Sequence, residues 1–134
     1  MLVWLGIWAI AATLMIAVDM VWLMWLGRGF YMQEIGELLL DTPNLPAALA
    51  FYGLYSVGVV LIIIIPALEA QSVLRALLVG ILFGLVAYGT YDLTNLAVMK
   101  GFTTKIALID MAWGGVVTGF VSAVTVKIAT SLGW

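Results

Sequence analysis

Three aspartates interrupt long apolar stretches, where a charged carboxylate is costly. Asp19, Asp92 and Asp110 each lie within a run of hydrophobic residues. A carboxylate at the centre of a membrane-spanning helix costs about 2.5–3.5 kcal/mol on insertion scales, and less near the interface. We therefore expect each carboxyl to be protonated, hydrogen-bonded, hydrated or bound to a cation. Carboxylate, amide and hydroxyl oxygens together suit hard cations.

Other polar residues share a helix face with one of these aspartates. Tyr88, Tyr91, Asp92 and Asn95 fall at positions i, i+3, i+4 and i+7, which places them on one stripe of a helix, with Thr94 beside them. A stripe of this kind would be costly against lipid. We therefore expect it to point into a bundle of helices.

Two aspartates are each followed by a tryptophan three residues later. Asp19 precedes Trp22, and Asp110 precedes Trp113. An indole N–H only donates and a carboxylate only accepts, so we expect each pair to satisfy itself locally. The similar motifs DMVW and DMAW do not indicate an inverted repeat, because both lie near the same end of the spans.

The composition excludes several classes of protein. Of 134 residues, 66% are hydrophobic and 9% are charged, so the chain cannot cover itself with a polar surface as a soluble domain does. It contains no Cys and no His, which removes disulfides, thiolate metal sites and imidazole ligands. We expect no cofactor. The net charge of −2 gives no basic footprint for nucleic acid.

The apolar segments predict an all-α, polytopic membrane protein that forms one domain over residues 1–134. Segments of about 20 apolar residues cross a bilayer, and they must be helical there. We expect a bundle of four transmembrane helices over residues 2–26, 47–68, 74–98 and 105–129. Pro66, in the last turn of the second span, is expected to end or kink it.

The one long connection, between the first two spans, has a partly amphipathic pattern. Residues 30–41 alternate apolar positions with Gln33, Glu34 and Glu37 at roughly helical spacing. The pattern predicts a short helix lying at the interface, with Glu34 and Glu37 toward water. An irregular loop is the alternative.

The alternating direction of the spans brings the aspartates to one side of the membrane. They lie eight residues before Gly27, eight before Lys100 and five after Lys105, which is roughly 8–12 Å inside the same face. We expect a one-sided polar pocket between the helices. The residues expected at this depth include Tyr52, Tyr55, Ser56, Thr94 and Asn95.

Small residues recur at intervals of four in the last two spans. Such stripes let helix backbones approach closely in lipid. The residues are Gly80 and Gly84 in the third span and Gly114, Gly115, Thr118, Gly119 and Ser122 in the fourth. Packing within the bundle is the favoured interpretation, and homodimerisation through the same stripe is the alternative.

The sequence resembles one bacterial family over nearly its whole length. The blocks YGTYDLTNLA at 88–97 and IDMAWG at 109–114, together with DMVW at 19–22, Tyr31 and Pro43-Asn44, are similar to the family known as domain of unknown function 2177. The resemblance implies a four-span protein of the bacterial inner membrane and carries no established activity.

Three functions remain open at this point. The first is binding or passage of a cation, a proton or a small polar molecule in the polar pocket, with Asp19, Trp22, Tyr88, Tyr91, Asp92, Thr94, Asn95, Asp110 and Trp113 as candidate site residues. The second is an accessory subunit that contacts lipid and other membrane subunits or a second copy. The third, an enzyme acting on lipid, is disfavoured because no recognisable nucleophile is present.

The basic residues give a small excess at one end of the bundle. Arg28, Lys100 and Lys105 flank the end that carries the aspartates, whereas Arg75 and Lys127 flank the other end. Because cytoplasmic loops carry more Lys and Arg, the excess favours a cytoplasmic polar end.

Overall fold

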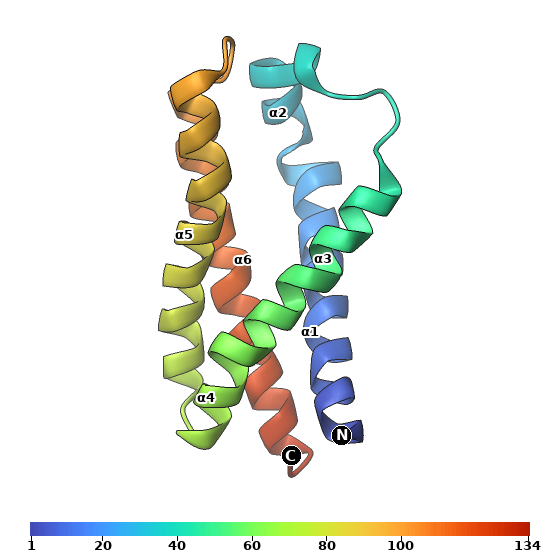
Figure 1. The fold of residues 1–134 in the computed structure, drawn as a ribbon, viewed down its shortest axis with the longest axis vertical. Helices are drawn as coiled ribbons and strands as arrows, with labels where there is room; N and C mark the ends of the chain where they lie inside the picture. Colours follow the sequence, from blue (N-terminus) through green and yellow to red (C-terminus); the bar gives the residue numbers. More distant parts are fainter.

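Four long helical segments run back and forth along one axis in the computed structural model, which describes residues 1–134 (Figure 1). They are Leu2–Leu26, Leu45–Glu69, Val73–Val98 and Thr104–Ser131, and each is long and apolar enough to cross a membrane. No strand is present. The predicted all-α, four-span membrane fold is confirmed, and the expected span boundaries fall within two residues of those observed.

Three of the long helices begin at a side-chain cap. In each case an oxygen of the residue before the helix accepts a hydrogen bond from a backbone N–H of the first turn, which would otherwise lack a partner. The caps are Asn44 for α3 (Leu45–Val59), Ser72 for α5 (Val73–Val98) and Thr103 for α6 (Thr104–Ser131).

The first two spans each contain a wider, π-helical turn. Helix α1 (Leu2–Val21) continues into η1 (Trp22–Leu26), and α3 continues through η3 (Val60–Ile64) into α4 (Ile65–Glu69). Pro66 lies in the first turn of α4. The helix therefore does not end at Pro66, and the π-helical turn directly before it is the local distortion that accommodates a residue with no N–H.

Helices α5 and α6 pack against each other along most of their length, and glycines make this contact possible. A Cβ atom added at Gly84 would lie 2.1 Å from the Gly114 carbonyl oxygen, and one at Gly80 would lie 2.8 Å from the Gly119 Cα. These glycines are buried inside the chain. They are therefore not available for contact with a second copy.

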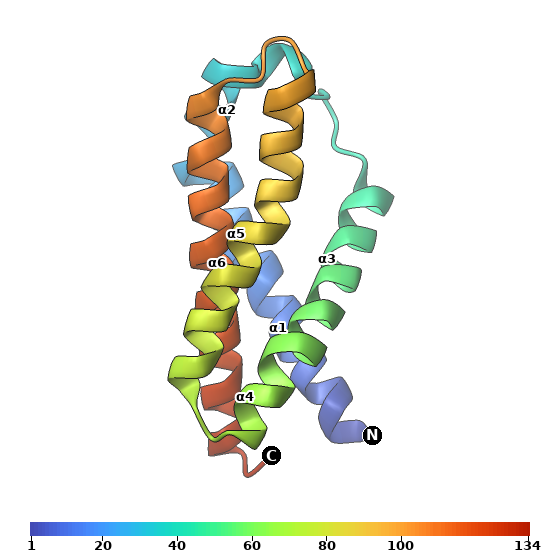
Figure 2. The ribbon, with the colours of Figure 1, turned by 60° about the vertical axis from the view of Figure 1, so that its left-hand side comes forward.

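A short helix closes one end of the bundle. Helix α2 (Arg28–Ile35) and the 3-10 turn η2 (Gly36–Leu38) lie across the end at which α5 connects to α6 (Figures 1 and 2). Ile35 packs there with Phe102, Ile106 and Ala107. The segment predicted over residues 30–41 is thus helical over Arg28–Leu38.

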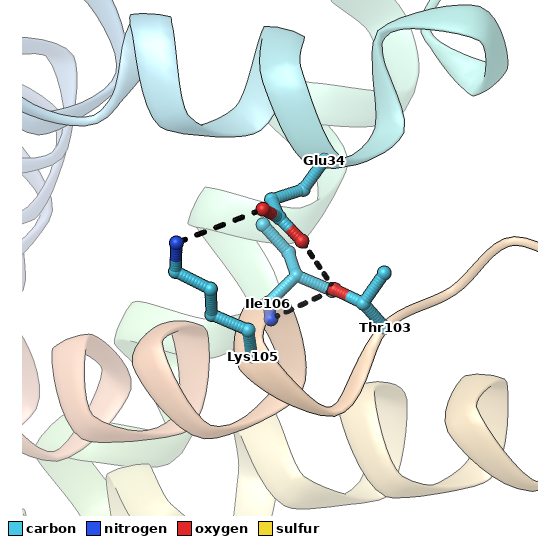
Figure 3. A network of polar contacts seen from close by, with 4 residues as sticks. All are labelled: Glu34, Thr103, Lys105 and Ile106. Carbon is cyan, nitrogen blue, oxygen red and sulfur yellow. Dashed lines mark hydrogen bonds and ion pairs between the residues drawn. The ribbon is translucent and has the colours of Figure 1, made fainter.

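Glu34 on α2 does not face water as we expected. Its Oε2 atom accepts a hydrogen bond of 2.7 Å from Thr103 Oγ1, and its Oε1 atom lies 3.8 Å from Lys105 Nζ (Figure 3). Thr103 is also the cap of α6, through its bond from the Ile106 N–H. Because α2 packs against the start of α6, Glu34 contacts Thr103 and Lys105, whereas Glu37 stays exposed.

The distance between helices α3 and α5 increases toward the end of the bundle that α2 closes. The two helices approach each other near α4 and are well separated at the start of α3 in both views (Figures 1 and 2). Helix α3 instead contacts α1. Residues of both α3 and α5 line the cavity described next.

Candidate functional site

Both oxygens of the Asp19 carboxyl accept a hydrogen bond. The Tyr52 hydroxyl donates to Asp19 Oδ2, and Trp113 Nε1 donates to Asp19 Oδ1 at 2.8 Å. The side chain is nearly buried. Its partners come from α3 and α6, so this carboxyl joins three helices. A carboxylate only accepts hydrogen bonds, and both of these contacts come from donors.

Asp110 is reached by the short helix that closes the bundle. The hydroxyl of Tyr31, on α2, donates to Asp110 Oδ1 and accepts a hydrogen bond of 3.0 Å from Trp22 Nε1. Burial, together with this hydrogen bond to Asp110, raises the pKa of Tyr31 above its ordinary value. Tyr31 therefore stays a neutral donor to the carboxyl.

The two Asp-Trp motifs are satisfied across helices, and the expectation of local pairs is wrong. Trp113 serves Asp19 directly, and Trp22 reaches Asp110 through Tyr31. The indole rings of Trp22 and Trp113 stack with centroids 4.5 Å apart and planes 8° apart. Because α1 and α6 are antiparallel neighbours, the two motifs lie side by side. Each indole therefore donates toward the carboxyl of the other helix, Trp113 directly and Trp22 through Tyr31.

A cavity of ≈ 420 Å³ lies between the two halves of this network. Its walls are mostly aromatic, and two carboxyls line it, one from α1 and one from α6. The lining residues are Asp19, Trp22, Leu23, Phe51, Tyr55, Ala87, Tyr88, Tyr91 and Asp110. The Tyr55 hydroxyl is held 2.8 Å from Thr118 Oγ1, which fixes this wall against α6.

Asp92 is buried and receives no hydrogen bond from a donor group. It is 0% exposed, and neither carboxyl oxygen makes a hydrogen bond. It does not line the cavity, but it has Asp110 as its acidic neighbour across the contact of α5 with α6. Asp19 and Asp110 thus line the cavity, whereas Asp92 lies next to Asp110 outside the cavity lining.

The remaining candidate residues of α5 are only partly brought to the site. Tyr88 lines the cavity, and Tyr91 lies at its edge with 58% of its surface exposed. Thr94 is exposed and Asn95 half-buried, and neither lines the cavity. The polar stripe does not point wholly inward, because α5 is covered by α6 on one side while α3 leans away from it.

Tyr31 and Phe51 complete the site without having been among our candidates. Tyr31 lies outside the spans, and only the folding of α2 back onto the bundle brings it to Asp110. Phe51, an apolar residue in an apolar helix, gives no signal in the sequence. Tyr52 and Tyr55 were expected at this depth, but their direct bonds to Asp19 and Thr118 could not be read from spacing.

The site carries acidic groups and no basic partner. The one ion pair of the structure joins Lys105 to Glu34, on α2, so no Lys or Arg side chain neutralises Asp19, Asp92 or Asp110. No group of three or more Asp, Glu, His or Cys side chains lies close enough together to hold a metal ion.

The four apolar helices and the polar residues between them define a multi-pass membrane protein. The family described as "Predicted membrane protein (DUF2177)" matches residues 4–127, so the chain belongs to this family. No match was found among the curated proteins or among the solved structures.

Proposed function

We propose that this membrane protein binds, or passes on, a small cationic species at the cavity between Asp19 and Asp110. The observation that carries the proposal is that carboxyls from two helices line one cavity and have no basic side chain as a partner. Negative charge in a low-dielectric setting attracts a cation or a proton more strongly than it would in water.

The donor set favours a proton or an organic cation over a desolvated metal ion. A hard metal ion needs several oxygen ligands around it, and these carboxyls do not gather into a group of that kind. The walls of the cavity are instead aromatic. Aromatic faces attract ammonium groups but do not replace the hydration shell of a metal ion.

The stacked indoles provide a way to test the proposal. Trp113 donates to Asp19 and stacks on Trp22, so a cation at Asp19 changes the surroundings of both rings. We expect tetramethylammonium to change the tryptophan fluorescence of the purified protein in a saturable way. Asp19→Asn and Asp110→Asn should each weaken this binding at least tenfold.

Asp41→Asn is the matched control. Asp41 is an exposed carboxyl in the connection before α3 and does not line the cavity, so this change removes the same charge outside the site and should leave binding unchanged. Equal affinity in all three variants, or no saturable change in the parent protein, would overturn the proposed function.

A further inference from the structure

We infer that the occupant is an amphiphilic organic cation, with its ammonium group against Asp19 and Asp110 and its hydrocarbon chain in a groove between α3 and α5. This inference rests on the proposed function and adds the chemical class of the ligand. It also assigns a second subsite, for the chain.

The groove adjoins the cavity between Asp19 and Asp110 directly. It has a volume of ≈ 380 Å³ and lies between α3 and α5. Phe51 and Tyr55 line both the groove and the cavity, so the two spaces share a wall. The groove carries no charged residue, and its lining residues are Phe51, Leu54, Tyr55, Val57, Gly58 and Phe83.

The cavity fits the head of such a molecule. Two carboxyls supply negative charge, and the aromatic residues Trp22, Tyr55 and Tyr88 line the same space. Ammonium groups are attracted to aromatic faces, and this attraction reaches about 2 kcal/mol or more when the contact is desolvated. An anionic head would instead meet two carboxyls and no basic side chain.

The groove fits a hydrocarbon chain that runs parallel to the acyl chains of one leaflet. From Phe51 to Gly58 the groove extends along α3 for roughly 10 Å, toward the middle of the span. Leu54 on its rim is 77% exposed, so the groove opens to the lipid side. A ligand can therefore enter the groove sideways from the bilayer.

Gly58 keeps the groove open. A Cβ atom at this position would lie 3.8 Å from Phe83 Cζ, which is ordinary contact. A longer side chain would extend into the space between α3 and Phe83. Gly53 lies on the same helix with nothing within 4 Å of an added Cβ, and it lines neither space. The two glycines therefore form a matched pair for substitution.

The test compares two cations that share one head group. Tetramethylammonium has no chain, and decyltrimethylammonium has a chain of ten carbons. Each is titrated into the full chain in lipid nanodiscs while tryptophan fluorescence is recorded. We expect the parent protein to bind the decyl compound at least tenfold more tightly. Gly58→Leu should reduce this advantage to less than threefold and leave tetramethylammonium unaffected, whereas Gly53→Leu should change neither affinity.

Two further results separate this inference from the proposed function. If Gly58→Leu keeps the full advantage of the chain, or if decyl sulfate binds as tightly as the decyl cation, the amphiphile inference is overturned. The proposed function survives the first result as long as Asp19→Asn still weakens tetramethylammonium binding. If Asp19→Asn and Asp110→Asn leave both cations unaffected, both proposals fail together.

Discussion

Asp19 and Asp92 are buried carboxyls at similar depth with opposite surroundings. Asp19 accepts hydrogen bonds from Tyr52 and Trp113, whereas Asp92 accepts none. A buried polar group without a partner keeps its desolvation cost, while a bonded one offsets it. The same chemical group therefore stabilises the fold at one position and destabilises it at the other.

Truncation of the two aspartates should accordingly have opposite effects. We expect Asp92→Ala to raise the free energy of unfolding by about 1 kcal/mol or more, because no donor group bonds to Asp92 and the change removes a buried acid that lies beside Asp110. Asp19→Ala should lower it by roughly 2–4 kcal/mol, because the Tyr52 hydroxyl and the Trp113 indole lose their acceptor. Unfolding in mixed micelles of dodecyl sulfate and dodecyl maltoside measures both. Equal destabilisation by the two changes would contradict the assignment of Asp92 as unpaired.

Tyr31 gives the stability a dependence on alkaline pH. Its folded pKa is raised by burial and by Asp110, so the folded protein binds this proton more tightly than the unfolded chain does. The contribution of the protonated Tyr31 hydroxyl to the free energy of unfolding is complete below the unfolded pKa of about 10. It is lost as the pH rises through the folded pKa.

Tyr31→Phe tests this dependence. The variant should be less stable at neutral pH by about 1–3 kcal/mol, because Asp110 and Trp22 lose their common partner. Its stability should then fall less steeply than that of the parent above pH 10. Unfolding curves recorded from pH 8 to pH 11 show the difference, and parallel curves for the two proteins would count against the role of Tyr31.

At the scale of elements, the sequence was sufficient for the helices but not for their mutual contacts. The spans follow from apolar length, and the small-residue stripes mark which surfaces approach closely. The crossed pairing of Trp22 and Trp113 depends on which helices become neighbours, and a single helix does not contain that information. The folding of α2 onto the bundle, which takes Glu34 from water and brings Tyr31 to Asp110, is likewise a property of tertiary packing.

The contact between α5 and α6 should tolerate no added methyl group at Gly84. A Cβ atom there would lie 2.1 Å from a backbone carbonyl oxygen of Gly114, so Gly84→Ala must push the helices apart. We expect a loss of stability of at least about 1–3 kcal/mol, measured by the same unfolding assay. Gly53→Ala is the control, because open space surrounds that position and alanine favours the helix. A Gly84→Ala protein as stable as the control would show that this contact is looser than described.

At the scale of the whole molecule, the two ends differ in charge and in polarity. The end closed by α2 carries the site together with Arg28, Lys100 and Lys105, whereas Arg75 and Lys127 flank the opposite end. The excess of basic residues favours a cytoplasmic location for the end that carries the site.

The absence of cysteine makes this orientation simple to measure. Glu37 lies at the end closed by α2 and Glu69 at the opposite end, and both are exposed. In intact bacterial cells that express single variants, a membrane-impermeant maleimide should label Glu69→Cys and spare Glu37→Cys until the cells are lysed. Labelling in the reverse pattern would place the site on the outer side.

The bonds of Asp19 have a consequence for how the chain is made. Its first donor, Tyr52, belongs to the second span, and its other donor, Trp113, belongs to the last. During synthesis the N-terminal part of a chain emerges first, so this carboxyl enters the bilayer before the helices that carry its two donors. It lacks its second donor until α6 is inserted, so a chain truncated before α6 would hold a carboxyl with only one of its two hydrogen bonds.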